Sequence, residues 1–255
     1  MTGGTYVDHT EIFTTKAALY EKSKPSYPDE LLTFLKQKFN IKEDTLIADM
    51  GAGTGRFTEK ILDLGCRVIA VEPNQTMADR LRDSLLCDQL EVSERPAEHT
   101  DIEEKSVDLV VAAQSFHWFH WQNFREECRR ILKPHGHVCL IWNIKDEDAM
   151  INRRTDDICK VYCPDYKGQS EGPTNDHSSI IQFFDGEFEL YEAQNDSCYD
   201  QQRFIERCLS SSYALEKADD NYDAFKTALY TIFETFAVEG KVIVPHTTRC
   251  YYGKI

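Results

Sequence analysis

A strand–turn–helix pattern at residues 46–61 places the strongest constraint on how this 255-residue chain can fold. The apolar run "LIADM" is followed by glycines at the alternate positions 51, 53 and 55, and then by the amphipathic stretch "RFTEKI". Glycine adopts the backbone conformations that sharp turns require, and it lets a ligand approach the main chain closely. The pattern predicts a buried strand that turns abruptly into a helix, which raises the question of what that turn binds.

Strand and helix patterns alternate through the first 145 residues. The strands are nearly continuous apolar runs, which is typical of a parallel sheet whose two faces are both covered by helices. The predicted strands lie at 45–50, 66–73, within 90–98, at 106–116 and at 137–143, and the predicted helices lie at 28–40, 55–65, 75–86 and 123–136. We therefore predict an α/β fold.

The pattern becomes irregular beyond about residue 145. We predict helices at 145–162, 201–213 and 221–237, a polar loop at 163–179, a strand within 188–199 and a terminal strand at 241–255. We expect the helical pieces to form a cap over the ligand-binding end of the sheet.

Composition excludes several classes of function. The net charge is −15, and basic residues form runs no longer than a pair such as Arg129 and Arg130, so a nucleic-acid partner is disfavoured. No stretch approaches the ~20 apolar residues of a membrane span, and the polar, acidic N-terminus is unlike a secretory signal. The nine cysteines are odd in number and scattered, so we expect reduced thiols in a cytoplasmic protein. Cys159 and Cys163 lack a CxxC or His-x3-His context, and no metal site is predicted.

Parallel sheets of this kind bind ligands beyond the carboxyl ends of their strands, near the point where the strand order reverses. Four segments lie at the carboxyl ends of predicted strands or just beyond them, namely 49–55, Glu72, 97–98 and 114–117. We expect the chemistry of the protein to be concentrated in these four segments.

Three kinds of ligand compete for the glycine turn. A Walker phosphate loop requires GxxxxGK[ST], but Arg56 and Phe57 follow the third glycine. A dinucleotide fingerprint requires GxGxxG, and here the third glycine comes one residue early. S-adenosylmethionine has no phosphate but carries a charged amine, which Asp49 is placed to hold. Glu72, 21 residues after Gly51, could accept ribose hydroxyls in NAD or in S-adenosylmethionine, so the glycine spacing and Asp49 favour the latter.

The sequence resembles the class I S-adenosylmethionine-dependent methyltransferases. "ADMGAGTGRFT" is similar to their first motif, D/E-x-G-x-G-x-G, and "VIAVEPNQTM" is similar to their second. The stretches "RPAEHTDIEEKSVDLVVAAQSFHWF" and "RRILKPHGHVCLIW" resemble the segments that follow. "FHWF" and "KAALYEKSKPSYP" resemble the small-molecule enzymes of the trans-aconitate and ubiquinone/menaquinone methyltransferase-like group, although Lys24 stands where that group usually has Arg.

The resemblance implies a Rossmann-like, mostly parallel seven-stranded sheet with helices on both faces and a helical cap from C-terminal insertions. It also implies an N-terminal segment (1–40) that closes over the cofactor, an S-adenosylmethionine-binding core (41–145), and a region (146–255) with cap helices and the last strands. The expected cofactor-binding residues are Asp49, Gly51, Ala52, Gly53, Thr54, Glu72, Pro73, Met77, Ala97, Glu98, Gln114 and Tyr20.

Tyr27 and Trp118 are expected to contact the substrate, and His117 is the candidate general base. Each of these residues also has a purely structural interpretation. The glycines would suit a tight turn without a ligand, Asp49 could cap the next helix, and "SFHWFHW" could be a packed aromatic corner.

The expected reaction is S-adenosylmethionine-dependent methyl transfer to a small-molecule acceptor, namely a carboxylate, a hydroxyl or a carbon acid. A carboxylate is already ionised and needs no base, whereas a hydroxyl would require one. The adenine-N6 pattern [DNS]PP[YFW] is replaced by "AQSF", which argues against DNA adenine methylation. A methyltransferase-like binding protein without activity and a nicotinamide-dependent oxidoreductase remain as alternatives, and both a monomer and a homodimer are compatible with the sequence.

Overall fold

The computed structural model of the chain describes residues 25–166, 168, 178–211 and 213–255. Contacts between residues divide the chain into two units. Among the described residues, the larger unit comprises 26–146, 178–196 and 245–255, and the smaller comprises Pro25, 147–166, 168, 197–211 and 213–244.

A seven-stranded sheet forms the centre of the larger unit, with the order β3-β2-β1-β4-β5-β9-β6. Its strands are β1 (Leu46–Met50), β2 (Arg67–Val71), β3 (Leu90–Ser93), β4 (Val107–Ala113), β5 (Leu132–Lys145), β6 (Glu189–Gln194) and β9 (His246–Gly253). The five strands from β3 to β5 are parallel, and β9 runs antiparallel to both β5 and β6. The mostly parallel, Rossmann-like seven-stranded sheet that the sequence predicts is therefore confirmed.

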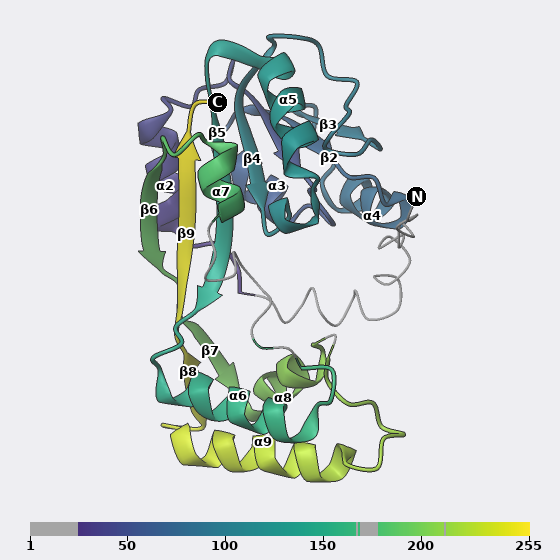
Figure 1. Cartoon of the computed structure of the whole chain (residues 1–255), viewed down its shortest axis with the longest axis vertical. Coiled ribbons are helices and arrows are strands. Elements are labelled where there is room, and N and C mark those ends of the chain that lie inside the picture. Colours follow the sequence, from purple (N-terminus) through teal and green to yellow (C-terminus); the bar gives the residue numbers. More distant parts are fainter. Residues whose placement is uncertain (1–24, 167, 169–177, 212) are drawn as a thin grey trace. The chain divides into compact units, whose positions relative to one another are not determined.

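Helices pack on both faces of this sheet. They are α2 (Asp29–Lys38), α3 (Arg56–Leu62), α4 (Gln75–Ser84), α5 (Trp121–Ile131) and α7 (Ser178–Phe183), together with the short 3-10 helix η1 (Phe116–Trp118). One core contains buried residues of α2 and α3, and the other contains those of α5 and α7. Figure 1 shows α5 and α7 in front of the sheet and α2 on its distant face.

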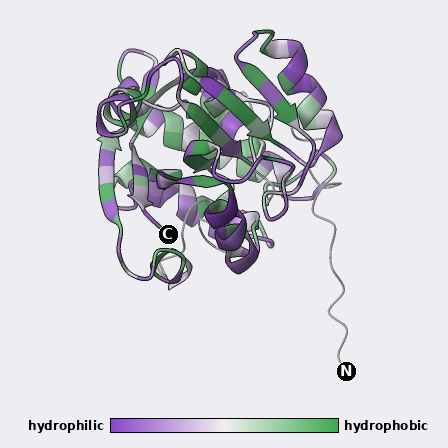
Figure 2. Cartoon of the chain, turned by 90° about the horizontal axis from the view of Figure 1, so that it is seen from above, coloured by the Kyte–Doolittle hydropathy of each residue, from purple (hydrophilic) through white to green (hydrophobic). Residues whose placement is uncertain are grey.

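The central strands β1 and β4 are mostly apolar because both of their faces are buried. In β4, Leu109 and Val111 belong to the core under α2 and α3, whereas Val110 and Ala112 belong to the core under α5 and α7. Alternate side chains of a strand point to opposite faces, so a helix layer on each side requires apolar residues at every position. Figure 2 shows the resulting concentration of hydrophobic residues along the central strands.

The smaller unit has its own core and its own short sheet. It contains the helices α6 (Met150–Tyr162), α8 (Gln201–Leu209) and α9 (Tyr222–Phe236), and the antiparallel pair β7 (Ser197–Asp200) and β8 (Lys241–Val244). Phe204, Phe225 and Val242 are among its fully buried residues. The carboxylate of Asp200 accepts a 2.8 Å hydrogen bond from the backbone N–H of Arg203, which caps α8.

Two predicted strands are each divided between the two units. Residues 241–255 form β8 and β9 rather than one terminal strand, and Pro245 lies between them. Proline has no N–H to donate to a ladder, so the pairing changes at that point. Residues 188–199 likewise form β6 and β7, and Asp196 lies in the break, where its Oδ1 accepts a 3.3 Å hydrogen bond from the backbone N–H of His246.

Two further predictions on the α5 side of the sheet need correction. The helix predicted at 123–136 ends at Ile131, and β5 begins at Leu132. Lys133 precedes proline and is therefore disfavoured in a helix, and the pairing of β4 with β5 shifts register between Val107 and Leu109. The helix α7 lies partly within the predicted polar loop, where the apolar spacing of "SSIIQF" is too short to stand out.

None of the helices in the described ranges combines the length and apolarity that a membrane crossing requires. Within the same ranges, no group of three or more His, Cys, Asp and Glu side chains is arranged to hold a metal ion. All nine cysteines lie in these ranges as free thiols, and Cys159 and Cys163 are both buried.

A candidate cofactor site at the switch point of the sheet

The candidate site lies where the strand order of the sheet reverses. β1 pairs with β2 on one side and with β4 on the other. Crossover connections leave such a pair of strands in opposite directions, which opens a crevice beyond their carboxyl ends. Asp49 is the penultimate residue of β1, and Gln114 directly follows β4, so these two predicted site residues flank the switch point.

The glycine turn folds back against the neighbouring strand. The N–H groups of Gly51 and Ala52 both donate to the carbonyl oxygen of Val71, at 2.8 and 3.0 Å. The turn continues through Thr54, which is half-buried, to α3, which begins directly after Gly55. The chain thus reverses at the edge where β1 and β2 end.

The three glycines are required for different reasons. All three have positive φ, at +69° for Gly51, +60° for Gly53 and +89° for Gly55. A Cβ atom at Gly51 would lie 2.6 Å from the Cβ of Ser115, and one at Gly55 would lie 2.9 Å from Leu81 Cγ, whereas one at Gly53 would meet nothing within 4 Å. Gly51 and Gly55 are thus fixed by packing, and Gly53 is the glycine whose main chain a ligand can approach.

Asp49 is a buried carboxylate with one oxygen satisfied. Its side chain is 1% exposed, and Oδ2 accepts a 2.7 Å hydrogen bond from the Thr58 hydroxyl. Oδ1 is buried and has no hydrogen-bond partner among the described residues. Burial raises the pKa of Asp49 to about 7, against the hydrogen bond from Thr58 and with a smaller contribution from the charge of Glu72. Such a group is stabilised by a cation that binds to Oδ1.

Glu72 joins the glycine turn to the start of α4. Its Oε2 accepts a 2.8 Å hydrogen bond from the N–H of Gly53, and its Oε1 accepts one of 2.9 Å from the N–H of Asn74. Burial raises the pKa of Glu72, while these two hydrogen bonds act in the opposite direction. The Asn74 side chain in turn caps α4 by accepting from the N–H of Met77 at 3.1 Å. Pro73, between them, is exposed.

Two further predicted segments lie at the ends of β3 and β4. Ala97 is buried in the core beneath α5, and Glu98 accepts a 2.8 Å hydrogen bond from the N–H of His120. Gln114 has a φ of +60°, and its side chain donates to the carbonyl oxygen of Asn143 at 3.3 Å. Glu98 is thereby linked to the residue that precedes α5, and Gln114 to the neighbouring strand β5.

His117 and Trp118 lie exposed on η1, one residue beyond the buried Phe116. The indole N–H of Trp142 donates a long, 3.5 Å hydrogen bond to His117 Nδ1. Because an indole N–H can only donate, a neutral His117 in this arrangement carries its own proton on Nε2.

Tyr27 packs its ring against α3, the helix that follows the glycine turn. Its ring lies 4.5 Å from that of Phe57, and burial together with the negative charge of Asp49 raises the pKa of Tyr27, while the positive charge of Arg56 opposes the change. Tyr20, also expected at the cofactor, lies outside the described residues.

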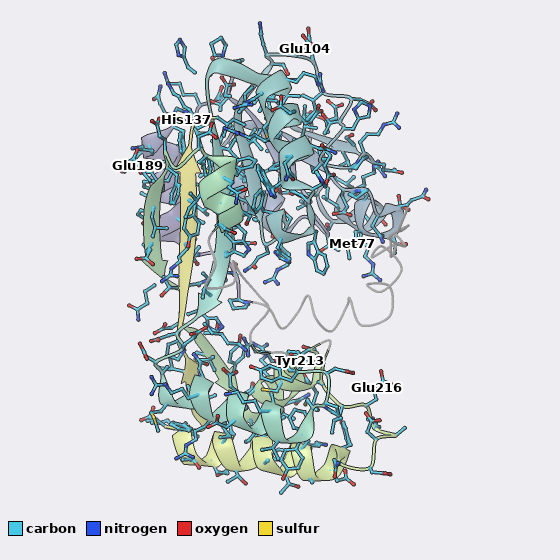
Figure 3. The ribbon with its side chains drawn as sticks, viewed as in Figure 1. Met77, Glu104, His137, Glu189, Tyr213 and Glu216 are labelled. Carbon is cyan, nitrogen blue, oxygen red and sulfur yellow. The ribbon has the colours of Figure 1, made fainter. Side chains whose placement is uncertain are left out.

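Figure 3 places the site at one end of the sheet. Met77, half-buried in the first turn of α4, lies toward the end where β1, β2 and β4 finish, and His137 and Glu189 lie at the opposite end. The ion pair of Lys38 with Glu189 therefore belongs to the far end of the sheet from the glycine turn.

Sequence reasoning missed the side chains that support this site. Thr58 holds the carboxylate of Asp49, and Ser115 holds the main-chain carbonyl of Met50. Asn74 caps the start of α4. A capping pattern identifies Asn74, because a helical run follows it directly. Thr58 and Ser115 carry no such local signal.

Comparison with known proteins agrees with this geometry. Residues 48–140, from β1 into β5, match the sequence profile of a family described as "Methyltransferase domain". This segment is therefore similar to a methyltransferase domain. The match includes the glycine turn, Glu72 and the segment around His117, and therefore every described site residue except Tyr27.

Relatives of the methyltransferase domain occur in fungi and bacteria. An uncharacterized methyltransferase-like protein of Schizosaccharomyces pombe is 37% identical over 136 residues, which is 53% of this chain and 52% of that protein. An uncharacterized methyltransferase of Mycobacterium tuberculosis is 35% identical over 135 residues, 53% of each protein. The chain thus spans about half the length of the curated relatives it matches.

Solved structures share the fold over most of the chain. A candidate type II methyltransferase from Anaeromyxobacter dehalogenans has a TM-score of 0.66 at 19% identity, covering 91% of this chain and 97% of that one. A candidate methyltransferase of an antibiotic biosynthesis pathway from Anabaena variabilis has a TM-score of 0.63 at 16% identity, and the match covers 92% of this chain and 100% of that one. At these identities the similarity concerns the fold.

Proposed function

We propose that this chain binds S-adenosylmethionine at the carboxyl ends of β1, β2 and β4 and transfers its methyl group to a small-molecule acceptor. The observation that carries the proposal is Oδ1 of Asp49, a buried carboxylate oxygen beside the glycine turn with no hydrogen-bond partner among the described residues. The ammonium group of S-adenosylmethionine would supply both the missing hydrogen bond and the missing positive charge.

The rest of the site fits the other parts of that cofactor. Each oxygen of Glu72 accepts one backbone N–H, and a carboxylate has about four lone-pair sites, so acceptors remain for two ribose hydroxyls. Gly53 leaves its main chain open to close approach. Met77, Ala97 and Glu98 follow β2 and β3, where we place the adenine.

The same charges disfavour a dinucleotide. Asp49 and Glu72 lie together at the turn, and the negative charge of Glu72 adds to the effect of burial in raising the pKa of Asp49. A pyrophosphate placed there would add negative charge to a site with two buried carboxylates, whereas a cation would relieve their repulsion. We therefore favour S-adenosylmethionine over NAD.

The residues on η1 and Tyr27 form the proposed acceptor side. When bound, S-adenosylmethionine would supply an electrophilic methyl group on a cationic sulfur. The exposed Trp118 ring offers a face that can lie against a cation. A neutral His117 with its proton on Nε2 donates a hydrogen bond rather than accepting a proton there. This tautomer favours an acceptor that is already ionised, such as a carboxylate, over a hydroxyl that needs a base.

Thermal unfolding with S-adenosylmethionine, S-adenosylhomocysteine, NAD and NADP tests the cofactor. A ligand at 100 times its Kd stabilises the native state by about 2.7 kcal/mol, which corresponds to a rise of roughly 5–10 °C in the unfolding midpoint. We expect this rise with the first two ligands only. A rise with a nicotinamide alone, or with none of the four, would overturn the proposal.

The acceptor is tested separately by following release of S-adenosylhomocysteine with a panel of small carboxylates, phenols and carbon acids. We expect turnover with a carboxylate. If turnover required a phenol and depended on His117, then His117 would be the general base and the preference for an ionised acceptor would be wrong.

A further inference from the structure

A cluster of polar side chains lies at the carboxyl end of β5, outside the residues that the proposed cofactor would touch. We call it the Ser26 anchor, and it consists of Asn143 on β5, Thr248 on β9, Asn195 after β6, and the main-chain carbonyl of Ser26. Asn143 is 6% exposed and Thr248 is fully buried. Buried polar groups are costly unless they are satisfied, so a cluster in this place calls for an explanation.

Hydrogen bonds determine the orientation of the Asn143 amide. Its Oδ1 accepts from the Thr248 hydroxyl at 2.6 Å and from Asn195 Nδ2 at 3.1 Å. If the amide were turned over, its NH2 group would face the NH2 group of Asn195, and two donors would meet. The Nδ2 of Asn143 is therefore directed to Ser26.

The Ser26 carbonyl oxygen is held by two amides. Asn195 Nδ2 donates to it at 2.7 Å, and Asn143 Nδ2 donates to it at 3.3 Å. Two residues further on, the Pro28 carbonyl oxygen accepts from the N–H of Leu31 at 3.1 Å, where α2 begins. Tyr27 lies between these two fixed points, so its backbone is held on both sides.

Asn143 also contacts the residue that directly follows β4. Its own carbonyl oxygen accepts a 3.3 Å hydrogen bond from the side chain of Gln114. One residue at the end of β5 is thus linked to both Tyr27, whose ring packs on Phe57 of α3, and Gln114, which flanks the switch point.

We propose that Asn143 is a positioning residue for the cofactor site. It holds the Tyr27 segment against α3, the helix that follows the glycine turn, and the Gln114 side chain at the end of β4, and it thereby sets the affinity of the site without touching the cofactor. The inference rests on the proposed function for its affinity arm. The anchoring of residues 26–28 stands on the hydrogen bonds alone.

Asn143→Ala tests the proposal against Asp108→Ala as a matched control. Asp108 lies at the start of β4, where its carboxylate accepts from the N–H of Leu46 at 2.9 Å and from Lys133 Nζ at 2.8 Å. Both variants remove a polar group that joins strands of the same sheet, so both should lower the unfolding midpoint. Asp108 is at the end of the sheet away from the glycine turn, and this position makes it the control.

The affinity arm measures the Kd for S-adenosylhomocysteine by calorimetry. We expect Asn143→Ala to weaken binding about tenfold, the equivalent of one lost hydrogen bond, and Asp108→Ala to leave the Kd within about twofold. Asn195→Ala, at a half-buried side chain, is a milder variant that should weaken binding in the same direction. Equal weakening by Asn143→Ala and Asp108→Ala would reduce Asn143 to a structural residue and overturn the proposal.

The anchoring arm measures hydrogen–deuterium exchange of residues 26–32 in the cofactor-free protein. Faster exchange in Asn143→Ala but not in Asp108→Ala is expected. This arm separates two failures. If wild-type protein binds no S-adenosylhomocysteine but exchange rises in Asn143→Ala, the proposed function is wrong and the anchor is real. If exchange is unchanged, the positioning role is wrong whatever the cofactor.

Discussion

The Thr58 hydroxyl donates a 2.7 Å hydrogen bond to Oδ2 of Asp49, and both side chains are buried between β1 and α3. Because Thr58 occupies Oδ2, the orientation of the carboxylate is fixed and Oδ1 is the oxygen left to a ligand. The strand, the glycine turn and the helix thus hold a carboxylate in a place where the described residues leave one of its oxygens without a hydrogen bond.

Asp49→Asn should weaken binding of S-adenosylhomocysteine by about 10- to 100-fold, because hydrogen bonds to charged groups contribute about 1.5–3 kcal/mol. The variant keeps the size of the side chain and an oxygen for Thr58. Calorimetric titration gives the Kd. Glu91→Gln is the control, since Glu91 is an exposed carboxylate on β3, and an equal loss in that variant would point to general charge rather than to Asp49.

The stability of the cofactor-free protein should depend on the ionisation of Asp49. Burial raises the pKa of this carboxyl from 3.8 to about 7, so the folded state favours the protonated form. The contribution of Asp49 to the free energy of unfolding is complete below about pH 4. It is lost as the pH rises to about 7, and the change is roughly 4 kcal/mol. Unfolding curves measured between pH 4 and 8 should therefore show that the stability of Asp49→Asn increases relative to that of the wild type as the pH rises. Parallel curves would contradict the assignment.

Affinity should change with pH in the opposite sense. The proposal has the ammonium group of the ligand bind the ionised form of Asp49, so binding of S-adenosylhomocysteine should tighten up to about tenfold between pH 6 and 7.5, and Asp49→Asn should abolish the dependence. The neighbouring groups Glu72, Tyr27 and Arg56 titrate or carry charge beside it, so the comparison must be made against the variant. A pH-independent Kd in the wild type would show that Asp49 does not receive the ammonium group.

Gly51→Ala and Gly53→Ala should separate packing from binding. Both have positive φ, which costs a non-glycine residue about 1–2 kcal/mol. Gly51→Ala adds a Cβ 2.6 Å from that of Ser115, and such overpacking costs a further ~1–3 kcal/mol of stability. We expect Gly51→Ala to lower the unfolding midpoint markedly, and Ser115→Gly to restore part of the loss.

Gly53→Ala should instead lose affinity with little further loss of stability, because its Cβ meets no protein atom within 4 Å but points into the space the cofactor would occupy. Thermal unfolding and calorimetry distinguish the two variants. If Gly53→Ala bound S-adenosylhomocysteine as tightly as the wild type, the turn would not be the cofactor contact.

Glu72→Gln should weaken nucleoside binding and loosen the glycine turn. The amide keeps one carbonyl oxygen but turns an NH2 group toward an N–H of Gly53 or Asn74, so one of the two hydrogen bonds is lost at about 1–3 kcal/mol. We expect a lower unfolding midpoint together with a weaker affinity for adenosine, measured by competition. Retained adenosine binding would place the ribose elsewhere.

Local patterns predicted the cofactor end of the fold well. Asp49, the glycines and Glu72 follow apolar runs directly, and a parallel sheet brings the ends of such runs to one edge. The family-level assignment therefore required only short stretches of sequence. The side chains that support the site could not be predicted from such patterns, because Ser115 binds the Met50 carbonyl from 65 positions away.

The Ser26 anchor was beyond sequence reasoning for the same reason. Asn143 and Thr248 are 105 positions apart, and Asn195 lies in a break between strands that the sequence shows as one run. That break and the one at Pro245 arise because neighbouring residues pair in different sheets. No periodicity within a single segment encodes such a change of partner.

The most direct test of the account is a calorimetric titration of the purified chain with S-adenosylhomocysteine, with NAD titrated in parallel. We predict saturable binding of one S-adenosylhomocysteine per chain, and no binding of NAD. Saturable binding of NAD without binding of S-adenosylhomocysteine would contradict the account, and the carboxylates of Asp49 and Glu72 would then need another explanation.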